Sequence, residues 1–224
     1  NLAWTYKKHK IAFKNLFNQL LEDNYYTRTG INTENLQDVL LRSSVLNQRS
    51  LYSAQLEGSH ELSKKGIKLN WNLNYALNNK TQPDLRVQTY GKSIGVNEPY
   101  RINLRGINTN RFYSELQDKS YGYNASLSVP FQLGSQKQLL KIGGAGTVRL
   151  RDFKAFIFGY SEPTDATLNT LPYNEIFSEA NIREGGFLIN TDLQNPYDKY
   201  YGVSALSAGY IMLDNKLSDK LRLV

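Results

Sequence analysis

The stretch "IKLNWNLNYALN", residues 67–78, alternates apolar and polar side chains almost without a break. The odd-numbered positions from Ile67 to Leu77 are apolar, and lysine and asparagine fill most of the even-numbered ones. Successive side chains of a β-strand point to opposite faces, so this period of two predicts a strand with one apolar and one polar face. The apolar face must be buried either in a protein core or in lipid.

Comparable β-rich sequence flanks four short polar segments, which predict tight turns between antiparallel strands. The predicted turns are "KKHK" (7–10), "SKKG" (63–66), "GSQK" (134–137) and "LSDK" (217–220). We expect about eight strands, over about 1–7, 10–27, 38–62, 67–79, 111–133, 138–160, 198–215 and from 220 to 224.

The other connections are expected to be long and rich in Asn, Thr, Gly and Pro, over about 25–37, 80–110 and 161–197. In an up-and-down meander alternate connections lie at the same end, so the short turns and the long loops would lie at opposite ends. That asymmetry is typical of outer-membrane barrels. The apolar run from Ile67 to Leu77, tilted by about 45°, would span roughly 25 Å, which matches the lipid-facing band of such barrels. The sequence therefore predicts an all-β, antiparallel up-and-down meander that is part of a transmembrane β-barrel.

Composition excludes several other classes. None of the 224 residues is cysteine, so neither disulfides nor thiolate metal sites are expected. The net charge of +7 comes from basic residues that occur singly or in pairs, so no nucleic-acid partner is predicted. No run of 18 apolar residues is present, and a barrel does not need one.

No enzyme signature is present. The sequence has no G-x-S-x-G motif and no HExxH motif, and its acidic pairs are too common a pattern to indicate a glycosidase. The two histidines, His9 and His60, fall in or beside predicted turns at the same end. Solvated histidines are expected there rather than a metal site, and no cofactor is predicted.

Ligand contacts are predicted in the long loops. The stretch "TYGKSIGVNEPYRINLRGINTNRFY" (89–113) interleaves aromatic and cationic side chains, which suit glycans, peptides or anionic chelates. Its candidate ligand-binding residues are Tyr90, Lys92, Tyr100, Arg101, Arg105, Arg111, Phe112 and Tyr113. A weaker second candidate is "YSEPTDATLNTLPYNEIF" (160–177).

Several strand segments resemble the barrel of TonB-dependent outer-membrane receptors of the Bacteroidetes type. They are "HKIAFKNLFNQ" (9–19), "YSAQLEGSHEL" (52–62), "LKIGGAGTVRLRDFKAFIFGY" (140–160) and the closing "GYIMLDNKLSDKLRLV" (209–224). The resemblance implies a barrel of about 22 strands around an N-terminal plug. No plug is recognisable in this sequence, so residues 1–224 are expected to be a partial barrel domain from the middle of a larger receptor.

A receptor of this kind would bind and import a nutrient such as a siderophore, a glycan or a peptide. The resemblance implies location in the cell outer membrane, contact with its lipid, coupling to the TonB system through the plug, and a surface lipoprotein as a further possible partner. Two alternatives stay open at this point: a soluble all-β carbohydrate-binding or surface module with its apolar side chains turned inward, and a small eight-stranded barrel acting as an adhesin.

Overall fold

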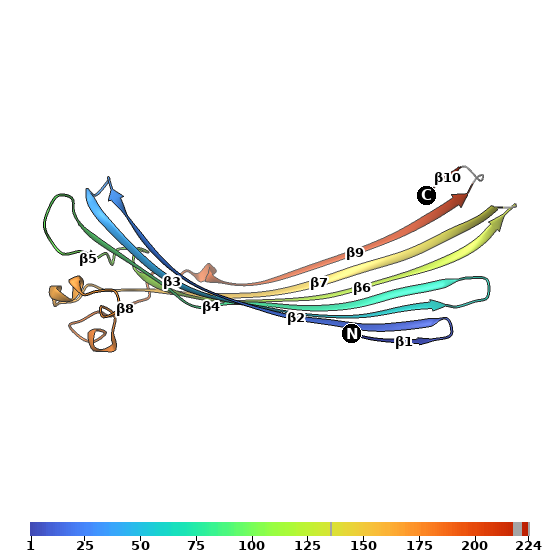
Figure 1. Cartoon of the computed structure of the whole chain (residues 1–224), viewed down its shortest axis with the longest axis horizontal. Helices are drawn as coiled ribbons and strands as arrows, with labels where there is room; N and C mark the ends of the chain where they lie inside the picture. Colours follow the sequence, from blue (N-terminus) through green and yellow to red (C-terminus); the bar gives the residue numbers. More distant parts are fainter. Residues whose placement is uncertain (135, 217–220, 224) are drawn as a thin grey trace.

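The computed structural model describes residues 1–134, 136–216 and 221–223. It consists of one open antiparallel sheet, bowed along its strands, with small loop structures at one end (Figure 1). The strands follow one another across the sheet in chain order, β1-β2-β3-β4-β6-β7-β9-β10. The predicted all-β, up-and-down meander is therefore confirmed.

The strands of this path are β1 (Leu2–Tyr6), β2 (His9–Asn32), β3 (Gln37–Glu61), β4 (Lys68–Ser93), β6 (Asn110–Leu133), β7 (Gln136–Tyr160), β9 (Lys199–Lys216) and β10 (Arg222–Leu223). Two short strands lie off the path, β5 (Arg101–Ile102) beside β4 and β8 (Ile189–Asn190) beside β7. The loops also hold the 3-10 helices η1 (Ala166–Thr170), η2 (Glu179–Asn181) and η3 (Pro196–Asp198). No helix among the described residues is long and apolar enough to cross a membrane.

The connections are sorted by length only in part as predicted: short turns lie at one end, but the other end holds two long connections and one short turn, 33–36 (Figure 1). The β1–β2, β3–β4 and β6–β7 turns lie at one end, and the connections 33–36, 94–109 and 161–198 lie at the other. The fourth predicted turn, 217–220, lies outside the described residues.

Two of the predicted long loops are wrong in extent. Residues 25–32 continue β2, and a four-residue turn follows, in which the Asn32 side chain accepts hydrogen bonds from the backbone N–H groups of Glu34 and Asn35. Residues 80–93 continue β4, which leaves a loop over 94–109. These segments are polar, but their backbone groups pair with neighbouring strands, and that pairing outweighs the weak strand propensity of Asn and Gly. The third long loop is confirmed at 161–198.

A β-bulge in β4 accommodates Pro83. On β3 the register passes from Gln48 to Leu46, whereas on β4 the paired residues pass from Thr81 to Asp84. The extra residue of β4 allows a proline that cannot donate to the ladder to lie inside a long strand.

The register aligns most of the apolar positions of the long strands on one side, here called the apolar face; Leu16, Leu20 and Leu206 lie on the other side. One row across it is Leu2, Phe13, Leu56, Leu73 and Tyr123. A neighbouring row includes Leu69, Leu127, Ile142 and Ile211.

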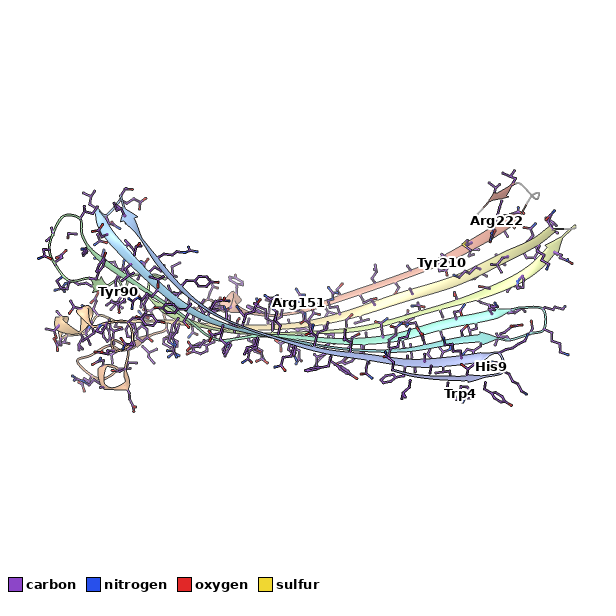
Figure 2. The ribbon with its side chains drawn as sticks, viewed as in Figure 1. Trp4, His9, Tyr90, Arg151, Tyr210 and Arg222 are labelled. Atoms are coloured by element: carbon purple, nitrogen blue, oxygen red, sulfur yellow. The ribbon has the colours of Figure 1, made fainter. Side chains whose placement is uncertain are left out.

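The turn-end half of the apolar face is uncovered. The exposed fractions are 51% for Leu73, 53% for Tyr123 and 75% for Ile211. Figure 2 shows side chains projecting from both sides of the sheet, with no second layer of described chain over the half that carries Trp4, His9 and Tyr210. The opposite, polar face carries asparagines and ion pairs such as Lys14 with Glu57 and Arg151 with Asp118.

The buried core lies at the long-loop end instead of under the middle of the sheet. Ile176 and Phe187 of the last long loop are fully buried against strand side chains that include Tyr90, Phe158 and Tyr160. The pairing of β6 with β7 has no break from Arg111 to Leu133, so Phe158 and Tyr160 lie on the apolar face. The last long loop therefore covers the far end of that face.

Candidate ligand pocket at the long-loop end

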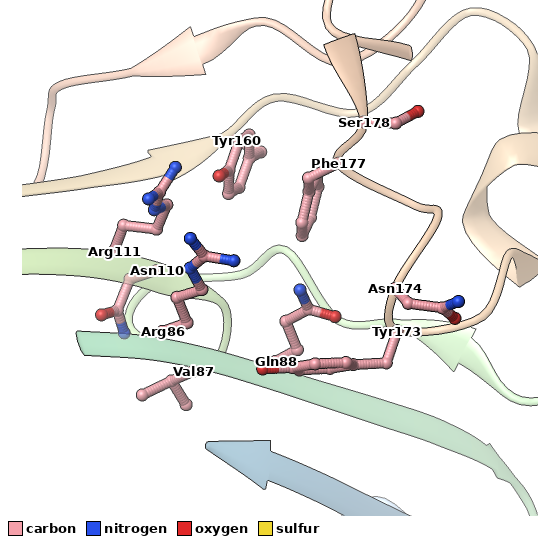
Figure 3. Close-up of a pocket in the computed structure, with 10 residues that line it drawn as sticks. All are labelled: Arg86, Val87, Gln88, Asn110, Arg111, Tyr160, Tyr173, Asn174, Phe177 and Ser178. Carbon is pink, nitrogen blue, oxygen red and sulfur yellow. The ribbon is translucent and has the colours of Figure 1, made fainter. Parts of the chain in front are cut away.

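The candidate functional site is a hollow of about 250 Å³ where the last long loop meets β4, β6 and β7. Its lining residues are Arg86, Val87, Gln88, Asn110, Arg111, Tyr160, Tyr173, Asn174, Phe177 and Ser178 (Figure 3). Small-molecule sites usually measure about 300–1,000 Å³, so this pocket is sized for one compact group.

Asp84 organises the cationic side of the pocket. Its carboxylate accepts hydrogen bonds from Nε and Nη2 of Arg111 at 2.9 and 2.6 Å, and from Nε of Arg86 at 2.6 Å. Burial alone would raise the pKa of the Asp84 carboxyl, but the hydrogen bonds from both arginines outweigh it and hold that pKa below its usual value. The carboxylate is therefore ionised at neutral pH and fixes both guanidinium groups.

Arg111 is the more rigidly held of the two arginines. Its guanidinium lies 5.6 Å from the ring centre of Tyr113 and 6.0 Å from that of Phe158, in addition to its two bonds to Asp84. Arg86 contacts Asp84 through Nε, and 51% of its side chain is exposed. Figure 3 shows both guanidinium groups directed toward Tyr160 and Phe177.

Aromatic rings form the other walls. The rings of Tyr160 and Phe177 stack with centroids 3.7 Å apart and an interplanar angle of 8°. Tyr173 lies on the opposite side of the hollow in Figure 3 and contacts Tyr25 edge-on at 5.9 Å. Burial raises the pKa of Tyr160, which therefore stays a neutral hydrogen-bonding group over the physiological range.

The structure divides the predicted ligand residues among four places: the pocket, the buried core, the polar face and the 94–109 loop. Arg111 lines the pocket, and the ring of Tyr113 packs against the Arg111 guanidinium. Tyr90 is a buried core residue whose hydroxyl donates to the Leu171 carbonyl oxygen at 3.2 Å. Phe112 lies on the polar face, because its neighbour Arg111 lies on the apolar one.

The four remaining predicted residues lie around the 94–109 loop. Lys92, Arg101 and Arg105 line a second, open and more polar hollow of about 570 Å³. Tyr100 packs beside them, with Lys92 Nζ 5.0 Å from its ring centre. This hollow contains no aromatic lining residue, so it offers cations without an aromatic wall.

Asp84 and Arg86 were missed in the loop-based prediction, which started at residue 89. The usable signal was Pro83, because a proline inside a strand pattern marks a bulge, and bulges occur next to functional sites. Tyr160, Tyr173 and Phe177 belong to the weaker candidate stretch 160–177. Only the structure places that stretch beside Arg111.

The two histidines lie together at the turn end, in contact with a tryptophan rather than solvated separately. Nδ1 of His9 lies 3.2 Å from Nδ1 of His60, and Trp71 Nε1 donates to His60 Nε2 at 2.9 Å. Within the described part of the chain, no group of three or more His, Cys, Asp or Glu side chains is arranged to hold a metal ion.

Comparison with known proteins identifies no relative: no protein-family model matches the sequence, and no curated protein matches it. The resemblance to TonB-dependent receptors therefore stays a prediction.

Proposed function

We propose that this chain is a section of the wall of an outer-membrane β-barrel, of the TonB-dependent receptor type, that takes up a nutrient. The observation that carries the proposal is the apolar face, which spans seven strands and is uncovered over its turn-end half. A soluble sheet of this kind would need a second layer to bury such a face.

The dimensions of the apolar face support lipid as its environment. On β6 it extends from Val129 to Lys119, which corresponds to roughly 33 Å at about 3.3 Å per residue. A tilt of about 45° reduces this to roughly 23 Å, close to the band of about 25 Å that barrels present to lipid.

Aromatic residues lie near both ends of this band, where membrane proteins concentrate them at the lipid–water interfaces. Trp4, Tyr6 and Trp71 lie near the turn end, and Phe17, Tyr52 and Tyr121 lie toward the loop end. By this reasoning the short turns are periplasmic and the long loops are at the cell surface.

The receptor assignment rests on the strand motifs that resemble this family. In such a receptor the polar face, with Asn70, Asn72 and Asn74, would line the lumen and meet water or the plug. Energy from the TonB system would act through the plug, and the long loops would meet the nutrient and any surface lipoprotein. The proposed role of this chain is structural and ligand-binding, without catalysis.

Two adjacent substitutions of the same kind test the proposal. Leu73→Arg places a charge on the apolar face and is expected to destabilise the assembled protein by about 2–4 kcal/mol, the cost of an arginine at the membrane midplane. Asn72→Arg places the same charge on the polar face, opposite Glu57 in the register, and is expected to be far milder.

The measurement is the amount of full-length protein recovered in the outer-membrane fraction and its resistance to unfolding in detergent. Equal loss for both variants would contradict the assignment of the two faces. Recovery of the unmodified protein in the soluble fraction would contradict the membrane location itself.

A further inference from the structure

The pocket at the long-loop end lies on the apolar face, not on the polar one. Arg111 and Tyr121 are both odd-numbered residues of β6, and the register between them is unbroken. Side chains ten residues apart on a regular strand share a face. If the apolar face meets lipid, the pocket opens on the outer side of the wall, beyond the surface end of the apolar band. It then lies away from any route through the lumen.

The charge of the pocket favours an anion. Two guanidinium groups and one carboxylate, those of Arg86, Arg111 and Asp84, leave a net charge of +1. Arg42 adds a further positive charge behind Tyr173, 5.8 Å from its ring centre, and its Nε is buried without a hydrogen-bond partner in the described structure. Arginine binds planar carboxylates and phosphates with paired hydrogen bonds.

The two arginines have different roles in this arrangement. Arg111 is held by two bonds to Asp84 and by two aromatic rings, so it is a fixed part of the wall. Arg86 is half exposed and bound to Asp84 through Nε, so its Nη groups are the ones positioned to bind a ligand.

The remaining lining groups match a sugar ring. The rings of Tyr160, Phe177 and Tyr173 offer apolar surface to the C–H faces of a sugar. Asn174 is exposed at the rim, and Gln88 is buried with its side-chain amide 3.3 Å from the Tyr90 hydroxyl. Amide groups both donate and accept, as sugar hydroxyls require.

We propose that this pocket binds one acidic sugar residue, with its carboxylate or phosphate on Arg86 and its ring against the aromatic wall. The volume of about 250 Å³ admits one such unit. The inference that the ligand is an acidic sugar depends only on the residues that line the pocket. The source of the sugar rests on the proposed function: a pocket on the lipid-facing side favours a membrane-anchored anionic glycolipid of the outer leaflet over a soluble glycan.

The test uses the full-length protein, purified from whichever cell fraction holds it, and ligand-observed NMR titrations with glucuronic acid and with glucose. Glucuronic acid is expected to bind at least about tenfold more tightly than glucose, the difference that one charge-assisted hydrogen bond supplies. Arg86→Gln should weaken glucuronic acid binding by about tenfold, and Asn174→Ala, at the exposed rim, should also weaken it.

Arg28→Gln is the matched control. It removes the same charge from an exposed residue near the same end of the sheet but on the opposite face, where Arg28 pairs with Leu41. It should leave binding unchanged. Equal affinity for the two sugars, no saturable binding, or full binding by a folded Arg86→Gln variant would overturn the proposal.

A second titration distinguishes the sources of the sugar. Lipopolysaccharide in vesicles and its deacylated oligosaccharide are compared on the same protein. Preferential binding of the vesicles that Arg86→Gln abolishes supports the anchored source. Equal binding of both forms overturns that source and supports a soluble acidic glycan. The glucuronic acid result does not depend on membrane location, so it can succeed even if the wall assignment fails.

Discussion

Glycines on one strand accommodate aromatic rings from the next at several places in the sheet. A Cβ atom built on Gly58 would lie 2.3 Å from Trp71 Cε2, and one on Gly146 would lie 2.6 Å from Tyr123 Cε1. The rings cover the glycine backbone, an arrangement that also pins the register of neighbouring strands. Two of the three glycines of "IGGAGTV" are thus required by close approach of a neighbouring ring: Gly146 by Tyr123 and Gly143 by Tyr210.

At Gly58 this contact predicts a measurable loss of stability. Gly58→Ala should displace the Trp71 ring and break its hydrogen bond to His60, at a cost of about 1–3 kcal/mol for overpacking. Denaturant unfolding followed by tryptophan fluorescence measures it. Gly30→Ala is the control, since a Cβ there meets nothing within 4 Å. Similar losses in both variants would show that the Trp71 contact is not the cause.

Asp84 predicts an acid-sensitive pocket. Because the pKa of its carboxyl is depressed in the folded state, its stabilising contribution is present above the usual value of 3.8 and is lost as the pH falls through the folded-state value. The protection of the backbone around Arg86 and Arg111 against hydrogen exchange, relative to the intrinsic exchange rate at each pH, should therefore fall below about pH 4. Asp84→Asn should remove this pH dependence and accelerate exchange already at pH 7, because it leaves Arg111 without its counter-charge.

The control for this pH effect is Glu115→Gln, an exposed position on the same strand as Arg111. That variant should keep the wild-type pH profile. An unchanged profile in Asp84→Asn would contradict the role assigned to the ion pair.

At the scale of an element, β4 unites two regions with different partners. Its first half contributes to the apolar band, and its second half carries Asp84, Arg86 and Tyr90 to the pocket and the core. The bulge between the two halves of β4 contains one residue that has no partner on β3. The pairing of each half with β3 therefore does not depend on that extra residue.

Single-residue deletions in β4 test this arrangement. Deleting Pro83 should preserve both registers, because it removes the residue that has no counterpart on β3. Deleting Asn78 should prevent assembly, because a shift by one residue turns the side chains of one half of the strand to the opposite face. Both variants are compared by outer-membrane recovery and protease resistance. Assembly of the Asn78 deletion would show that the register of β4 is not specified as described.

At the scale of the whole molecule, both tryptophans of the chain report on the same face. Trp4 pairs with Ile11, which pairs with Gly58, which in turn pairs with Trp71, so all four residues lie in one row. The 224 residues contain two tryptophans, and both lie in this row.

Lipids brominated on their acyl chains should therefore quench Trp4 and Trp71 in the reconstituted full-length protein. The part of the fluorescence that is lost when Trp4→Phe and Trp71→Phe are combined should accordingly be a part that these lipids quench. Acrylamide, a water-soluble quencher, should have little effect on that part. The reverse pattern would indicate that the apolar face is covered by protein, as in a soluble all-β module.

The alternating sequence by itself determined the strands, their antiparallel order and which side chains share a face, because the period of two is local and the short turns force neighbouring strands to pair. It also located the last long loop. The prediction of long loops over 25–37 and 80–110 was wrong in extent. Polar strand extensions and loops have the same composition, and only backbone pairing distinguishes them.

Only the tertiary structure decided the site. Asp84 and Arg111 are 27 residues apart, and Tyr160 and Tyr173 lie still farther along the chain. They meet because β4, β6 and β7 lie side by side at their loop ends and because the last loop folds back over the apolar face. No local pattern encodes that fold-back, which follows from burial of Ile176 and Phe187 against residues of distant strands.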